Sequence, residues 1–174
     1  MNSVELLRDA FARVADDIPG LLTGLDPDAV AWRPQPGANS IGCLVWHLAR
    51  VEDDHTSGIA AALGLSGGEQ VWHQGWLERF GLPYPDDAIG YGQDSSEVAA
   101  FQAPAQLLVD YHAEVHRVTA QLLDQLDEQQ LDAVVDEHWD PPVTAGVRLV
   151  SVVNDITQHL GQAAYLKGLL AQPL

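Results

Sequence analysis

The segment VNDITQHLGQ, residues 153–162, lies within a long apolar-periodic stretch near the C-terminus. Among its Val, Ile and Leu residues it carries an acid and an imidazole, Asp155 and His159. On a helix, side chains four residues apart share one face and lie about one turn, roughly 6 Å, apart. Why an apolar helix places these two groups side by side depends on what faces them from the rest of the fold.

Helical periodicity recurs in four segments, at residues 3–25, 40–63, 104–126 and 147–170. Asn39 and Ser40 are candidate caps for the second segment, and Pro19 with Gly20 should interrupt the first. No segment shows sustained two-residue alternation. The pattern therefore predicts an all-α protein, a four-helix bundle.

A connection of about 40 residues, 64–103, separates the second and third predicted helices. Turns between neighbouring antiparallel helices are much shorter, whereas a crossover that makes two successive helices run parallel needs such a length. The sequence therefore predicts crossover topology. Trp72 and Trp76 lie in this connection, and we expect them to pin it onto the bundle rather than to contact a substrate.

Composition limits the classes of function. The chain of 174 residues is 47% apolar, enough for one substantial core, so we expect a single domain, 1–174. Its 25 acidic against 8 basic residues give a net charge of -17, which disfavours nucleic acid and anionic membranes as partners. With one cysteine, Cys43, and no leader pattern at the start, the sequence is typical of a soluble cytoplasmic protein.

Counting about 100° per residue places Asp155 and His159 together on one shoulder of the core stripe of their helix. His47 falls on the shoulder of the second helix by the same count. If those two helices are neighbours, the three side chains can converge in the groove between them. Two imidazoles and a carboxylate suit a divalent ion, resembling a catalytic zinc site with an open fourth position, although iron, nickel and manganese take the same donors. The alternative is a buried Asp and His that hydrogen-bond each other without a metal.

Other residues compete for this role. His112 and His116 share the four-residue spacing, but the apolar seam of their helix leaves His116 pointing outward, so we interpret them as a solvated flank. His55 lies about two turns, roughly 12 Å, beyond His47, too far to bind the same ion, and belongs to the core edge or to a pocket wall. Cys43 is one turn before His47, where packing as a small apolar residue is favoured over ligation.

Two stretches together resemble a known family: SIGCLVWHLARVEDDH, residues 40–55, and VNDITQHLGQAAYLKGLL, residues 153–170. They are similar to the DinB-like superfamily, particularly its actinobacterial branch related to mycothiol-dependent maleylpyruvate isomerases and other thiol S-transferases. The resemblance implies a bundle with up-down-down-up connectivity and a metal held by one side chain of helix two and two of helix four, here His47, Asp155 and His159. Many members have histidine at all three positions, whereas the maleylpyruvate isomerases place a carboxylate where this chain has Asp155.

The resemblance also implies an activity, the metal-dependent activation of a small, mycothiol-type thiol for transfer to an electrophilic small molecule, with zinc as the expected ion. Asp54 and Gln162 lie two turns along the shoulders of His47 and Asp155 and could line the cofactor pocket, or could simply be polar surface. Two rival functions remain open: a bundle that binds metal or a partner protein without catalysis, and a metal-dependent hydrolase. A homodimer is an open alternative to a monomer.

Overall fold

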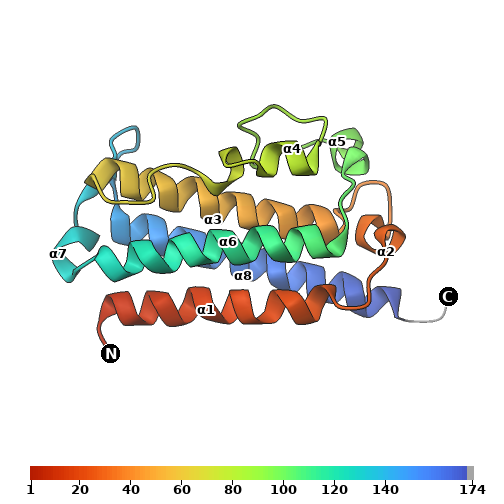
Figure 1. Ribbon diagram of the computed structural model, residues 1–174, viewed down its shortest axis with the longest axis horizontal. Helices are drawn as coiled ribbons and strands as arrows, with labels where there is room; N and C mark the ends of the chain where they lie inside the picture. The colour runs from red at the N-terminus through yellow and green to blue at the C-terminus, as the bar shows by residue number, and fades with distance from the viewer. Residues whose placement is uncertain (172–174) are drawn as a thin grey trace.

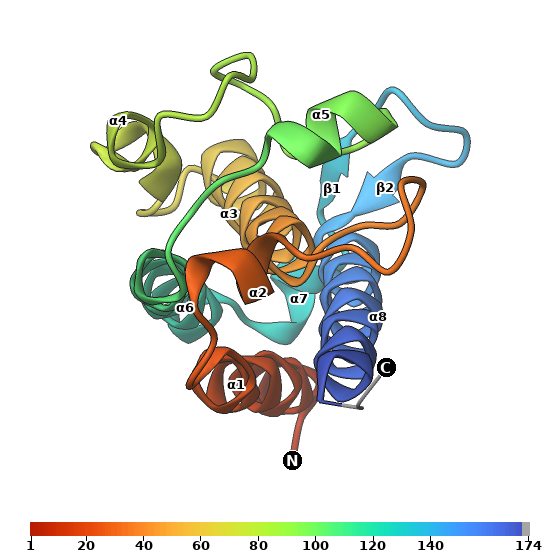
Figure 2. The same ribbon diagram turned by 90° about the vertical axis from the view of Figure 1, so that its right-hand side faces the viewer.

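Four long helices form the body of the protein in a computed structural model that describes residues 1–171. They are α1 (Ser3–Leu22), α3 (Ile41–Leu63), α6 (Ala105–Gln125) and α8 (Ala145–Leu170). In Figure 1, α1 and α8 run in one direction and α3 and α6 in the other, so the connectivity is up-down-down-up. Seen end on in Figure 2, α3 lies between α6 and α8, and it packs against both. The predicted fold class and the adjacency of the second and fourth long helices are confirmed.

The ends of the helices follow from local capping. The Asn2 side chain accepts a hydrogen bond from the backbone N–H of Glu5 and completes a capping box at α1, and the Ser40 hydroxyl accepts one from Cys43 N–H at the start of α3. The expected interruption near Pro19 is wrong, because α1 continues to Leu22. Proline lacks an N–H donor, so one bond of the helix is lost, but the last turn still closes through the Thr23 N–H, which donates to the Pro19 carbonyl at 3.0 Å.

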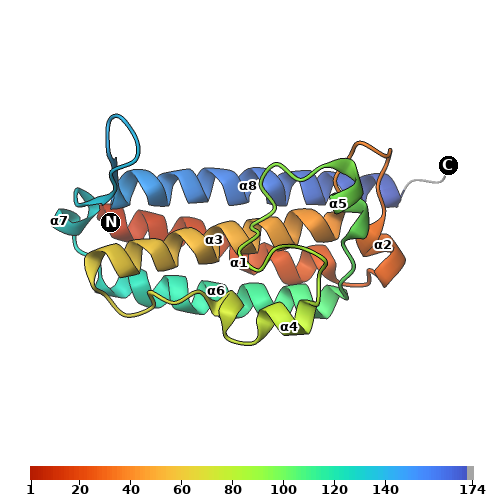
Figure 3. The same ribbon diagram turned by 90° about the horizontal axis from the view of Figure 1, so that it is seen from above.

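The long connection carries only short helices: η1 (Val71–His73), α4 (Trp76–Phe80) and α5 (Ser95–Ala100). It folds over α3, as Figure 3 shows, and buried polar groups of α3 hold it there. The Asp53 carboxylate accepts the backbone N–H groups of Val71 and Trp72, both at 2.8 Å, and Arg50, 0% exposed, donates to the Ala88 carbonyl. Trp72 and Trp76 are buried, which confirms that they anchor the crossover.

Two short helices and two short strands complete the described chain. The helix α2 (Pro27–Ala31) precedes α3, and α7 (Glu128–Leu131) follows α6. Between α7 and α8 the strands β1 (Val134–Asp136) and β2 (Val143–Thr144) pair antiparallel, a departure from the all-helical expectation that involves only five residues.

No helix among residues 1–171 is long and apolar enough to cross a membrane. The predicted domain, 1–174, ends with residues 172–174, which lie outside the described part of the chain.

Candidate metal centre

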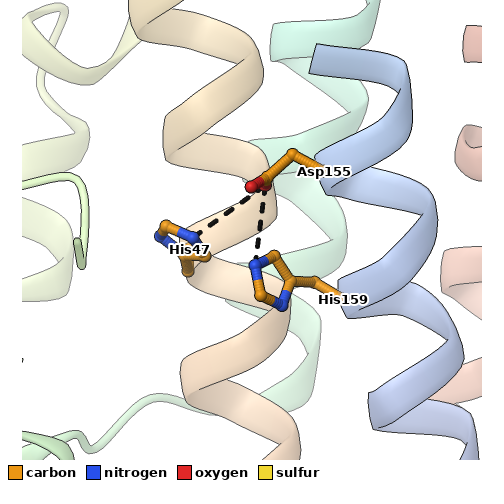
Figure 4. A group of neighbouring side chains, drawn as sticks. All are labelled: His47, Asp155 and His159. Carbon is orange, nitrogen blue, oxygen red and sulfur yellow. Dashed lines mark ion pairs between the residues drawn. The ribbon is translucent and has the colours of Figure 1, made fainter. Parts of the chain in front are cut away.

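His47, Asp155 and His159 meet in the groove between α3 and α8. One ligand atom from each lies within 4.8 Å of the other two. The Asp155 Oδ1 atom is 3.9 Å from His47 Nε2 and 3.6 Å from His159 Nε2, and Figure 4 shows both imidazoles turned toward the carboxylate. These separations are compatible with three ligands of a single divalent ion, and they arise because α3 and α8 pack along their length.

Both imidazoles are oriented by a hydrogen bond at the opposite nitrogen. His47 Nδ1 donates to the carbonyl oxygen of Ile89 at 2.5 Å, and His159 Nδ1 donates to Gln162 Oε1 at 3.1 Å. We assign the tautomers from these acceptors, which leave each Nε2 lone pair facing Asp155. Such outer partners are the usual device by which metal-binding histidines are fixed in orientation.

The Asp155 carboxylate is the group that favours an ion over a simple polar pair. Its Oδ1 atom is buried and has no hydrogen-bond partner, and 3.6–3.9 Å is too long for a hydrogen bond to either imidazole. A buried polar atom without a partner is costly unless something else satisfies it. The donor set and this unsatisfied oxygen therefore fit a divalent cation, and the alternative in which Asp and His satisfy each other does not account for the distances.

The charges at the centre also suit a cation. Burial raises the pKa of Asp155, but His159 and His47 outweigh it and lower that pKa, so the carboxylate is anionic at neutral pH. Burial lowers the pKa of His47, which favours the neutral imidazole that a metal requires. The pKa of His159 is raised by Asp155, so protons compete with the ion at this residue.

A cavity of about 290 Å³ opens beside the centre. Besides the three candidate ligands it is lined by Asn39, which precedes α3, by residues of α3, by the loop after Ile89 and by α5; beyond Asn39 these are Cys43, Leu44, Gly90, Tyr91, Gly92, Gln93 and Val98. Cys43 is buried, as expected, and burial raises the pKa of its thiol to about 11. The thiol therefore stays protonated and packs in the wall.

The comparisons with known proteins agree with this geometry. The profile of the DinB superfamily matches residues 10–163. This chain belongs to the DinB superfamily. Members of this superfamily often bind metal, and it includes metal-dependent enzymes.

A solved structure is also similar to this DinB-superfamily chain. It is the crystal structure of a conserved protein from Enterococcus faecalis, 34% identical, covering 96% of each chain with a TM-score of 0.83. No curated protein matches the chain. The superfamily and fold are thus shown, whereas the narrower resemblance to mycothiol-dependent enzymes stays a prediction.

The two residues predicted to line a cofactor pocket lie in different places. Gln162 adjoins the centre through its bond to His159. Asp54 instead lines a second, larger hollow of about 630 Å³, where its carboxylate contacts His55 at 3.2 Å and accepts from Gln70 Nε2 at 2.8 Å. His55 lines this second hollow too, in keeping with a pocket-wall position. A role in cofactor binding for Asp54 and Gln162 stays a prediction.

The interpretation of His112 and His116 as a solvated flank is wrong. His112 is 1% exposed and its Nε2 lies 3.2 Å from Glu52 Oε2, while His116 Nδ1 lies 3.7 Å from Glu52 Oε1. The reason is Glu52, which α3 directs at α6 and which requires cationic or donor partners because it is fully buried. A signal was present in the sequence, since Glu52 follows Leu48 by one helical turn on the apolar side of its helix.

Proposed function

We propose that this DinB-superfamily protein is a metal-dependent transferase that binds a divalent ion, zinc in the first instance, through His47, Asp155 and His159. It would activate a low-molecular-weight thiol for transfer to an electrophile. The observation that carries the proposal is the convergence of three ligand atoms within 4.8 Å around an unsatisfied carboxylate oxygen, directly beside a cavity. Three protein ligands with open space at the side are typical of catalytic rather than structural zinc sites.

The residues of the chain contribute position and charge. Asp155 supplies an anionic ligand, and the Ile89 carbonyl and Gln162 hold the two imidazoles with Nε2 presented. A bound divalent ion would supply Lewis acidity that favours the thiolate form of an added thiol near neutral pH, where a free thiol of pKa about 8.5 is only slightly ionised. The thiol loses its proton to solvent, a carbon–sulfur bond forms, and the leaving group of the electrophile departs with the bonding electrons.

An external thiol is favoured because the protein offers no reactive sulfur of its own. Its single cysteine, Cys43, is buried and has a pKa raised to about 11 by burial. A thiol that is protonated and packed does not act as a nucleophile at neutral pH. The resemblance to mycothiol-dependent enzymes makes a mycothiol-type donor the first one to test.

The test uses purified full-length protein in three forms: zinc-loaded, stripped with a chelator, and Asp155→Ala. Metal content is measured by mass spectrometry, and turnover of 1-chloro-2,4-dinitrobenzene is followed with a panel of thiols. We expect one ion per chain, thiol-dependent turnover above the uncatalysed rate in the loaded protein, and loss of that turnover in the other two forms.

The other possible outcomes would support a different function or contradict the role of the metal ligands. Metal binding without turnover for any thiol would identify a non-catalytic binding protein. Metal-dependent hydrolysis of aryl esters in the absence of thiol would identify a hydrolase. Turnover that survives complete removal of metal would contradict the role given to the three ligands.

A further inference from the structure

Tyr91 belongs to the loop that borders the cavity beside the metal centre. It is 90% exposed and is one of the residues that line this cavity. Large aromatic side chains usually bury most of their surface, so a ring left almost entirely in water beside a candidate reaction centre is more informative than an exposed small residue. Its neighbours Gly90 and Gly92 have φ values of +89° and +72°, in the left-handed region that favours glycine.

The base of this loop is fixed against the metal centre. A Cβ atom at Gly90 would lie 2.9 Å from His47 Nδ1 and 3.0 Å from a ring carbon of Trp46, closer than a side chain can be accommodated. Ile89, one residue earlier, accepts the hydrogen bond that orients His47. The backbone therefore passes directly over His47, and the next side chain after that approach is Tyr91.

Part of the wall of this cavity is apolar. Leu44, Val98 and the neutral thiol of Cys43 are buried there, and the amides of Asn39 and Gln93 add polar groups to those of the three candidate ligands. At about 290 Å³ it lies at the lower end of small-molecule sites, which are typically about 300–1,000 Å³. The second hollow is larger and carries side chains of both charges, such as Asp54, Asp136 and Arg148, whereas the carboxylate in the lining of the smaller cavity is that of the candidate ligand Asp155.

We infer that the smaller cavity binds an uncharged molecule with a single planar apolar ring, and that Tyr91 stacks on that ring and determines specificity for it. In the proposed transferase this molecule is the electrophile, so the assignment as a substrate rests on the proposed function, whereas the binding itself does not. A planar ring matches the small volume and the apolar part of the wall, and an aromatic side chain in the bordering loop provides the remaining face.

The experiment measures binding rather than turnover. The probe is 1,3-dinitrobenzene, which has no halide to displace, and its Kd is measured by calorimetry for metal-free and for zinc-loaded protein. Tyr91→Ala should weaken binding about two- to tenfold, the range expected for loss of one aromatic pair, while Tyr91→Phe should retain it. Tyr165→Ala is the matched control, because Tyr165 is also an exposed tyrosine, 68% exposed, but lies on α8 away from the lining of this cavity.

The inference is overturned if the probe does not bind, or if Tyr91→Ala and Tyr165→Ala give the same Kd as the unaltered protein. It is also overturned if cyclohexanol, a saturated ring of similar size, binds as tightly as the probe. The two proposals fail separately. If the protein turns over substrate but Tyr91→Ala leaves the Kd of the probe unchanged, only the role of Tyr91 is wrong. If binding of the probe depends on Tyr91 but no thiol gives turnover, only the transferase activity is wrong.

Discussion

Two clusters in this bundle use the same chemical groups in different surroundings. His47, Asp155 and His159 join a carboxylate to two imidazoles between α3 and α8, and Glu52, His112 and His116 do so between α3 and α6. In both, two of the residues lie four apart on one helix. The Asp155 side chain is 37% exposed and lines a cavity, whereas the Glu52 side chain is 0% exposed. Donor types alone therefore do not distinguish a ligand site from a structural one.

The two clusters differ in how their carboxylate oxygens are hydrogen-bonded. Glu52 Oε2 is within hydrogen-bond distance of His112, at 3.2 Å, so this buried carboxylate has one partner within the fold, although its Oε1 atom, 3.7 Å from His116 Nδ1, has none. The Oδ1 atom of Asp155 has none, and its nearest imidazole nitrogens are 3.6 and 3.9 Å away. We interpret the α3–α6 cluster as a buried carboxylate–imidazole contact that supports the core and the α3–α8 cluster as a site prepared for a ligand.

The largest expected effect is on stability. Glu52→Ala should lower the free energy of unfolding by about 3–5 kcal/mol, because it leaves buried His112 without its partner. Asp155→Ala in metal-free protein should change it by less than about 1 kcal/mol, since that carboxylate is partly exposed. Urea denaturation of both variants provides the measurement. Equal losses in the two variants would remove the distinction between the clusters.

Acid should reduce the stabilisation that the Glu52 cluster gives to the fold. Burial raises the pKa of Glu52, but His112 and His116 outweigh it and lower the pKa from an ordinary 4.5 to about 2. Because the folded pKa is depressed, the stabilisation is complete above about pH 4.5 and is lost as the pH falls toward 2. Denaturation curves recorded between pH 6 and 2.5 should show this loss. The matched Glu52→Gln variant should show a shallower dependence on pH, and an identical dependence would contradict the assignment.

Metal affinity should depend on the cluster of His47, Asp155 and His159 and not on the Glu52 cluster. Asp155→Ala should weaken zinc binding at least tenfold, because the anionic ligand is lost and protons still compete at the histidines. His116→Ala should leave affinity nearly unchanged, since His116 contacts Glu52 and not the α3–α8 groove. Competition with a chromogenic chelator measures both constants. A similar loss in both variants would mean that the ion binds elsewhere or that the clusters are coupled.

The smallest effect is expected at Cys43. Cys43→Ala should retain most of any thiol-transfer activity, because the protonated, buried sulfur takes no part in the proposed chemistry. Initial rates with a saturating thiol test this directly. Loss of activity together with unchanged zinc content and unfolding free energy would assign the sulfur a chemical role.

Periodicity was sufficient to predict the architecture of this protein. Four amphipathic segments and one connection too long for a turn led to a crossover bundle, because burying an apolar stripe on each helix leaves few arrangements. The same helical count placed His47, Asp155 and His159 on facing shoulders, and the structure brings them together. Helical spacing is local, so it can be read from a single chain.

What only the tertiary structure decided is how each polar group is surrounded. His112 and His116 carried the same spacing as the candidate ligands, and their burial depended on Glu52 arriving from α3, 60 residues from His112 along the chain. The loop that fixes His47 through Ile89 and presents Tyr91 lies in the crossover, 42 residues after His47. Which side chains meet across helices, how much water they keep and whether a carboxylate is left without a partner depend on packing between distant segments. The sequence by itself therefore determined the helices and the candidate ligands, and the packing determined which imidazoles support the core and which face a cavity.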